Sequence, residues 1–422
     1  MWRREPGFHI PGRSNLQTIK AHFAQFLADR LSKSPFASTK MPAIAWGEQA
    51  PFEKVIQTKE QVELLRKMPS LYRNSVCIIE PWENVGQNPE GEVVRASLNV
   101  AYIAQAVGDL DATLIPAWKG IYDAVDLARF ASESAAFVVE GGAPAVYDEK
   151  TFTHSACSRD DLLALIEALL LTRADRGAPG LFICLGHQLA AEAHVRLIKR
   201  AIKAIETGAP DGLKAVAQRI SAVGEQLKWD KAQFATAQNA EAELRGHVLC
   251  AYQVPTPEAM GVAEEVLETY EVTAQARGLI DLMQQYAGDL KIDMFHRDIA
   301  TQEAAIFCSW AYTKLHEACL YHRQELACGH LDWLLRLPYA VKILASTRAQ
   351  GKLITANAAT CIFYRDFDTG QLKRSFTTQF HPELWDDLKD FGHRLPPSYQ
   401  ELKTHAGNRM LVHLLQEGLH DA

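Results

Sequence analysis

The sequence lacks the marks of several protein classes. No apolar run reaches the roughly 18 residues of a membrane-spanning helix, and no apolar signal-peptide core follows the charged residues at the start. None of the eight cysteines forms a CxxC pair, which suits a reducing compartment better than a disulfide framework. We therefore expect a protein that neither enters a membrane nor is secreted, and that works in the cytoplasm.

Positive charge is not concentrated in any one segment of the chain. The net charge is -7, and the 44 Lys and Arg residues are spread along the chain without a basic stripe, so we expect no nucleic-acid partner. With 422 residues and 48% hydrophobic content, the chain has room for two or three domains and can fill a core. A globular enzyme is compatible with this composition.

Residues 14–31 carry apolar side chains at spacings of three and four, a pattern typical of an amphipathic helix. We interpret this helix as part of an N-terminal extension over residues 1–72 that packs on the body. A mitochondrial transit peptide is the alternative, because basic residues outnumber acidic ones there.

Short apolar runs alternate with helical patterns from residue 75 onward. The expected strands are 75–80, 113–118 and 135–142, and the expected helices are 96–108, 122–132 and 160–173. Such alternation predicts an α/β fold with a mostly parallel sheet flanked by helices.

The pattern becomes almost wholly helical between residues 201 and 324, which predicts a large helical insertion. Strand patterns then return, and Asp368-Thr369-Gly370 is expected to turn a hairpin. The α/β domain is thus expected over residues 73–200 and 325–395. A C-terminal helical tail is expected over residues 396–422.

A cysteine stands between an apolar strand and an alanine-rich helix, in Ile183-Cys184-Leu185-Gly186-His187-Gln188. A side chain on such an elbow faces the N-terminus of the helix, whose N–H groups and dipole favour a reactive thiolate. The alternative is a buried structural cysteine.

A thiolate that attacks a carboxamide needs a base, and the base needs an anion that orients it. His381-Pro382-Glu383, at the end of an apolar strand, supplies both groups. An ordinary surface loop with a histidine and a glutamate is the alternative.

Paired glycines end another strand, in Val139-Glu140-Gly141-Gly142. Backbone without a Cβ can approach a ligand closely. The N–H groups of Gly142 and Leu185 are therefore candidates for an oxyanion hole, although a Gly-Gly pair is often only a turn.

Together these segments resemble the class I glutamine amidotransferase family, over about residues 75–200 and 325–390. A glycine turn, a cysteine elbow ending in Gly-His-Gln, and Gln-Phe-His-Pro-Glu follow one another in the family's order. The resemblance implies that Cys184 forms a γ-glutamyl thioester, that His381 acts as base and acid, and that Glu383 orients His381.

The resemblance also assigns supporting roles. It implies an oxyanion hole at Gly142 and Leu185, and substrate contacts from Gln188 and His330. The chain departs from the family where Phe182 replaces a usual glycine, and where Ala143-Pro144 follows the glycines in place of Pro-Gly.

Members of this family generally hydrolyse glutamine and pass ammonia to a synthase, without a cofactor in the glutaminase site. Because the chain has no GxxxxGK loop, we expect a glutaminase-type enzyme that serves a separate ammonia-accepting synthase. Two alternatives are a stand-alone γ-glutamyl amide or peptide hydrolase and a non-catalytic binding relative. The oligomeric state is open, with a homo-oligomer as one alternative.

A metal site is a weaker interpretation of the histidines and cysteines near residue 320. His316, Cys319 and His322 fall at helical spacings, and Cys328 and His330 follow. The set matches no usual zinc spacing, so no metal is expected.

Overall fold

The structure is a computed structural model that describes the following residues: 52–55, 62–63, 75–83, 85–87, 93–108, 110–120, 123–152, 156–172, 177–226, 234–236, 250–251, 298–300, 302–349, 352–383, 408 and 411–416. Residues 45–422 form one compact unit. The helix expected at residues 14–31 lies outside the described residues.

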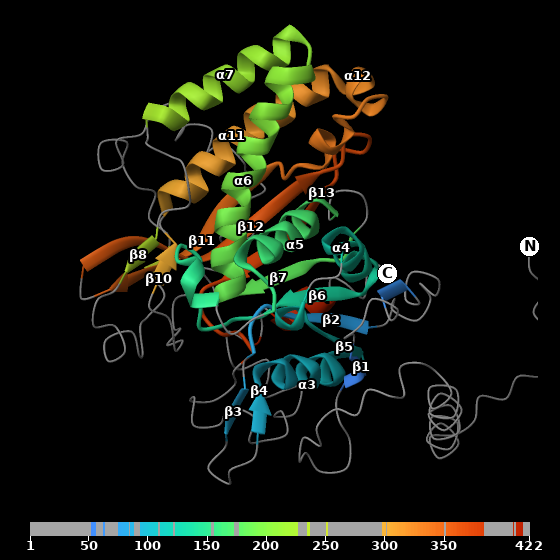
Figure 1. Cartoon of the computed structure of the whole chain (residues 1–422), viewed down its shortest axis with the longest axis vertical. Helices are drawn as coiled ribbons and strands as arrows, with labels where there is room; N and C mark the ends of the chain where they lie inside the picture. The colour runs from blue at the N-terminus through green and yellow to red at the C-terminus, as the bar shows by residue number, and fades with distance from the viewer. Residues whose placement is uncertain are drawn as a thin grey trace, which may run out of the picture. The chain divides into compact units, whose positions relative to one another are not determined.

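A nine-stranded sheet forms the centre of this unit (Figure 1), in the order β1-β5-β2-β6-β7-β13-β12-β11-β9. The strands are β1 Phe52–Val55, β2 Ser75–Glu80, β5 Asp111–Pro116, β6 Ala136–Val139, β7 Gly180–Ile183, β9 Cys250–Ala251, β11 Ala340–Ala349, β12 Lys352–Arg365 and β13 Leu372–Thr378. Pairing is parallel from β1 to β13 and antiparallel from β13 to β9. The expected α/β class with a mostly parallel sheet is confirmed.

Helices cover both faces of the parallel strands. The helices are α3 Ala96–Gly108, α4 Ala124–Glu133, α5 Arg159–Thr172, α6 Leu185–Gly208, α7 Asp211–Gln226, α11 Gln302–Tyr321 and α12 Arg323–Ala327. The connection through α3 runs from β2 to β5, and those through α4 and α5 run the opposite way across the sheet, to β6 and then β7. Because such crossovers are right-handed, α3 lies on one face and α4 and α5 on the other, as Figure 1 shows.

The apolar runs form the central strands because both faces of the sheet are covered. Every residue of β2, β6 and β7 is buried, so these strands read as continuous apolar stretches without alternation. The helix expected near residues 122–132 is α4, and Asp123 caps its N-terminus by accepting hydrogen bonds from the backbone N–H groups of Val125 and Asp126.

The structure adds three details to the expected domain organisation. Helix α6 continues through the boundary at residue 200, because its helical apolar periodicity does not stop there. The segment 201–324, expected to be almost wholly helical, also contains short strands: β9 pairs with β11, and β8 Phe234–Thr236 pairs with β10 Asp298–Ala300. The N-terminal extension contributes β1, which pairs with β5. These strands have two to four residues, too few for a pattern of alternation.

Two further predictions concern turns and termini. The hairpin at Asp368-Thr369-Gly370 is present between β12 and β13, with Gly370 at φ 68°. Part of the expected C-terminal tail, residues 411–416, is helical. A small sheet of β3 Val85–Gln87 and β4 Val93–Arg95 lies outside the main one.

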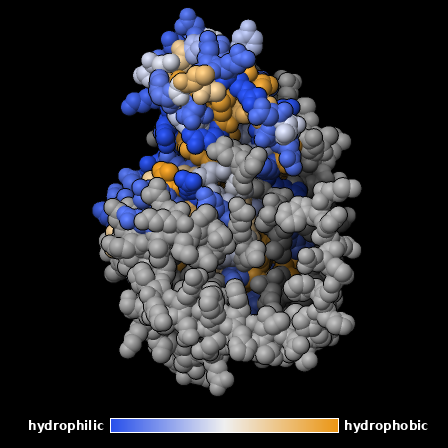
Figure 2. Space-filling model, turned by 90° about the vertical axis from the view of Figure 1, so that its right-hand side faces the viewer, coloured by the Kyte–Doolittle hydropathy of each residue, from blue (hydrophilic) through white to orange (hydrophobic). Residues whose placement is uncertain are grey.

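The described surface carries few large apolar side chains, and those that are well exposed are Val125, Tyr147, Leu320 and Tyr321. On the face shown in Figure 2, the upper region, which contains α7 and α12, is mostly hydrophilic. Among the described helices, none has the length and apolar character needed to cross a membrane.

Candidate active site

The register of three neighbouring strands brings distant segments to one edge of the sheet. Val139 of β6 pairs with Phe182 of β7, and Thr378 of β13 pairs with Ile183 of β7. The residues that follow these strands therefore meet at the carboxyl edge, where open α/β sheets bind ligands.

Cys184 occupies a strained elbow between β7 and α6. With φ 50° and ψ -102°, it is the one non-glycine residue with positive φ in the described part of the chain. Its N–H donates to the carbonyl of Thr378 at 2.7 Å, and its carbonyl accepts from the N–H of Gln188 at 3.1 Å. A sheet bond on one side and a helix bond on the other thus hold a conformation that costs about 1–3 kcal/mol.

Phe182 does not prevent this elbow from forming. Its ring packs against Phe137 in a T-shaped arrangement, with 5.5 Å between centroids. The phenyl group is fully buried in the core, so it leaves the backbone at Cys184 free to turn.

Two glycines let backbone segments approach Cys184 closely. A Cβ on Gly186 would lie 2.7 Å from the carbonyl oxygen of Val139, so α6 starts in direct contact with the end of β6. A Cβ on Gly141 would lie 3.0 Å from Cys184 Cβ and 3.0 Å from His381 Cε1. Gly141 therefore lies against both the cysteine and the histidine.

The candidate oxyanion residues are neighbours in space. A Cβ on Gly142 would lie 2.7 Å from Leu185 Cδ2 and 2.6 Å from Trp82 Cβ. The structure thus places Gly142 and Leu185 side by side next to Cys184. Trp82, which follows β2, also packs against Gly142, and no motif in the sequence indicated this contact.

His381 is held between Cys184 and Glu383. Its Nδ1 lies 2.7 Å from Glu383 Oε1, and the Glu383 side chain is 2% exposed. Because Nδ1 faces the carboxylate, Nε2 is the nitrogen available to the thiol. Burial lowers the pKa of His381, but the charges of Glu383 and Cys184 and hydrogen bonds with both side chains outweigh it, so the pKa is raised well above its usual value. The surroundings therefore favour a protonated imidazole.

Two amides extend the contacts of the thiol. Gln379 Nε2 donates to Cys184 Sγ at 3.7 Å, and Gln188 Nε2 donates to Gln379 Oε1 at 3.3 Å. Gln379 belongs to the Gln-Phe-His-Pro-Glu motif, but sequence reasoning assigned it no role. Gln188, expected at the substrate, is buried and bonded to Gln379.

A residue from the C-terminal tail supports the histidine loop. The buried side chain of Asn408 donates from Nδ2 to the carbonyl of Pro382 at 2.7 Å. Pro382 lies between His381 and Glu383, so Asn408 helps to fix the backbone that carries both. No motif in the sequence indicated this contact.

The structure places His330 away from Cys184, so the substrate contact expected from His330 is not supported. His330 is exposed, and its Nε2 lies 3.0 Å from the position of a Cβ on Gly208, the last residue of α6. Because α6 has 24 residues and begins directly after Cys184, its two ends are about 35 Å apart. The expectation relied on nearness in sequence to the final strands, whereas His330 lies at the far end of this helix.

The histidines and cysteines near residue 320 point in different directions. His316 stacks on Phe367 with 4.2 Å between ring centroids, whereas His322 bonds Glu325. Among the described residues, no group of three or more potential ligands is placed to hold a metal ion.

A comparison of the chain with protein-family models finds no match, and neither does a comparison with curated proteins. The geometry around Cys184 is therefore the main indication of what the protein does.

Proposed function

We propose that the protein hydrolyses the side-chain amide of glutamine through a cysteinyl thioester at Cys184, in the manner of a class I glutamine amidotransferase. The observation that carries this proposal is the strained elbow at Cys184, flanked by Gly141, with the Cys184 side chain hydrogen-bonded to His381 and His381 in turn bonded to Glu383. Strained backbone persists where the surrounding structure enforces it, and it is concentrated at functional sites.

In the proposed first step, the Cys184 thiolate attacks the amide carbon and a carbon–sulfur bond forms. The resulting oxyanion accepts hydrogen bonds from the N–H groups of Gly142 and Leu185. The His381 imidazolium then donates its proton to the departing nitrogen, which leaves as ammonia when the carbon–nitrogen bond breaks.

In the proposed second step, neutral His381 takes a proton from water while the water oxygen attacks the thioester. The carbon–sulfur bond breaks, glutamate leaves, and the thiolate–imidazolium pair is restored. Glu383 holds the ring through Nδ1 and stabilises the imidazolium in both steps. The chemistry needs no metal or cofactor, and we propose that a separate synthase in the cytoplasm accepts the ammonia.

A glutamine-mimicking chloroketone tests the glutamine pocket. The expected result is one adduct on Cys184, located by peptide mapping, prevented by excess glutamine and absent from Cys184→Ala. Since Cys328 is an exposed thiol, Cys328→Ala is the matched control that removes non-specific labelling. Labelling of Cys184 that glutamine fails to prevent would reject a glutamine site.

A substrate panel separates the proposed activity from its alternatives. Glutamine is expected to turn over faster than γ-glutamyl amides and peptides, and ammonia release is expected to rise when the acceptor synthase is added. Faster turnover of a γ-glutamyl peptide would assign the site to a peptide hydrolase instead.

A further inference from the structure

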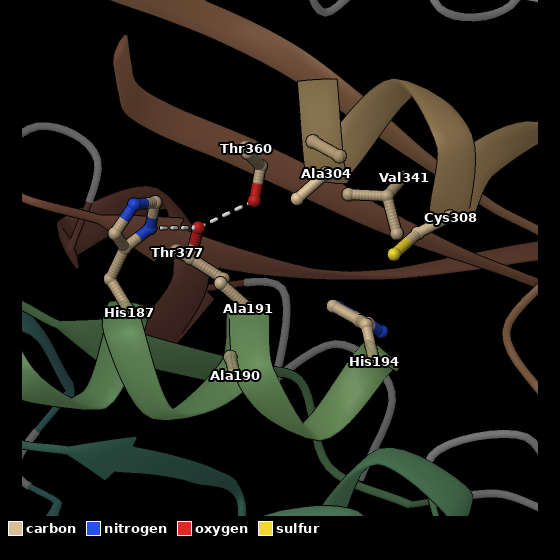
Figure 3. A pocket seen from close by; sticks show the side chains of 10 residues that line it. His187, Ala190, Ala191, His194, Ala304, Cys308, Val341, Thr360 and Thr377 are labelled. Carbon is tan, nitrogen blue, oxygen red and sulfur yellow. Dashed lines mark hydrogen bonds between the residues drawn. The ribbon is translucent and has the colours of Figure 1, made fainter. Parts of the chain in front are cut away.

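A small cavity lies inside the protein beside the first turns of α6 (Figure 3). It is lined by residues of α6, α11 and strands β11 to β13, and has a volume of about 20 Å³. A water molecule needs roughly 10–15 Å³ of such volume. The cavity therefore has room for one molecule of the size of water.

One wall of the cavity is polar. His187 Nδ1 lies 2.7 Å from Thr377 Oγ1, and the hydroxyls of Thr377 and Thr360 are hydrogen-bonded to each other. His187 is on the first turn of α6, three residues after Cys184. This wall thus connects the cavity with the helix turn that carries the candidate active site.

His194 supplies the second polar group. It is 4% exposed, and its Nδ1 lies 3.0 Å from the hydroxyl of Tyr312. Its buried Nε2 has no hydrogen-bonding partner among the described residues. Burial and the neighbouring His187 lower the pKa of His194 to about 3, so the ring is neutral at physiological pH. In either neutral tautomer Nε2 is an N–H donor or a lone-pair acceptor, so a molecule in the cavity that His194 lines could satisfy it.

The remaining lining is apolar and consists of small side chains and one thiol, from Ala190, Ala191, Ala304, Ala305, Val341 and Cys308. Cavities lined only by apolar groups stay dry, whereas a buried water usually has two to four polar partners. The imidazole lies on one side of this cavity and the threonine hydroxyls on the other. Such a lining is typical of cavities that hold a hydrogen-bonded molecule.

We propose that the cavity binds one neutral, water-sized molecule that hydrogen-bonds His194 Nε2 and the threonine hydroxyls. Two molecules share this chemistry: solvent water, and the ammonia that the proposed reaction releases at Cys184. Ammonia as the occupant rests on the proposed function, whereas water does not.

High-resolution crystal structures of three proteins test the site. In the wild type, an electron-density peak is expected within hydrogen-bond distance of His194 Nε2. His194→Phe keeps the ring shape and removes the nitrogen, so the peak is expected to disappear. Tyr312→Phe removes the hydrogen bonds of the Tyr312 hydroxyl with His194 Nδ1 and with the His194 carbonyl but leaves Nε2 in place, and the peak is expected to remain.

A third variant guards against loss of folding in His194→Phe. Ala305→Val adds two methyl groups to the cavity wall from α11, away from Cys184, and is expected to displace the peak without loss of the fold. A wild-type cavity without density, or a peak that stays in place in His194→Phe, would overturn the proposal.

Nitrogen-15 NMR of labelled histidine distinguishes the two sources. At pH 9, ammonium chloride provides free ammonia, and potassium chloride at equal concentration is the control. A saturable change in the His194 Nε2 signal with ammonium chloride alone identifies ammonia as a ligand of the site, and an unchanged signal identifies water. Because no glutamine is used, these results stand apart from the outcome of the chloroketone test.

Discussion

Replacement of Gly186 by alanine should damage the site through the backbone. The new Cβ would lie 2.7 Å from the Val139 carbonyl oxygen and 3.2 Å from that of Glu140, so neither contact can be relieved by rotating a side chain. The start of α6 must therefore move away from the end of β6 by several tenths of an ångström. Cys184 and Gly141 are attached directly to these two segments.

Two opposing effects determine how much Gly186→Ala changes the free energy of unfolding. Alanine favours a helix over glycine by about 1 kcal/mol, whereas overpacking a core costs about 1–3 kcal/mol. Because the clash is with backbone, we expect the upper part of that range and a net loss of about 1–2 kcal/mol. Displacement by even 1 Å can lower catalysis about 100-fold, so activity should fall far more than stability.

Urea unfolding measures the change in stability, and the rate of Cys184 alkylation measures the change in the reactivity of the site. Gly329→Ala is the matched control, because its Cβ would meet no atom closer than 3.5 Å and the residue is exposed. The control should unfold within about 0.5 kcal/mol of the wild type. A Gly186→Ala protein that matches the control in both assays would refute the reasoning.

Three further substitutions probe the same site. Glu383→Gln should lower the pKa of His381, because it removes the carboxylate charge that is the largest of the effects raising that pKa. The raised pKa of folded His381 stabilises the wild type fully below about pH 6.5, and this contribution is lost as pH rises through the folded pKa. The difference in free energy of unfolding between wild type and Glu383→Gln should therefore shrink from about pH 5 to 9 in urea unfolding. A difference that does not change with pH would contradict this. Asn408→Ala leaves the Pro382 carbonyl without this donor, so unfolding should become easier by about 1–3 kcal/mol and Cys184 alkylation slower. Unchanged alkylation would show that Asn408 does not position the histidine loop. Cys184→Gly should be about 1 kcal/mol more stable than Cys184→Ala in urea unfolding, since glycine relieves a positive φ that alanine retains; equal stability would argue against strain at the elbow.

The sequence predicted those parts of the fold in which local pattern and burial agree. Strands β2, β6 and β7 are buried on both faces and therefore appear as uninterrupted apolar runs. Strands β1 and β9 are too short for any periodicity, and each joins the sheet through pairing with a distant partner. Such pairing depends on tertiary contacts, which a local pattern does not contain.

The sequence likewise predicted some residues of the candidate site and missed others. Cys184, His381 and Glu383 stand in motifs with a chemical logic of their own, and the structure brings them together. Asn408 lies in a segment without a motif, and its role emerges only because the tail folds back onto Pro382. His330 was misplaced because sequence order does not reveal that α6 carries the chain away from the site.

The pairing of β13 with β7 has a consequence during protein synthesis. The elbow leaves the ribosome first, and its base follows about 200 residues later, which corresponds to about 10–40 s of translation at the usual 5–20 residues per second. Until β13 docks, the thiol faces the cell without the histidine that is proposed to activate it. If the protein has the proposed function, a nascent or truncated chain is therefore inactive, and activity begins only once β13 has been added to the sheet.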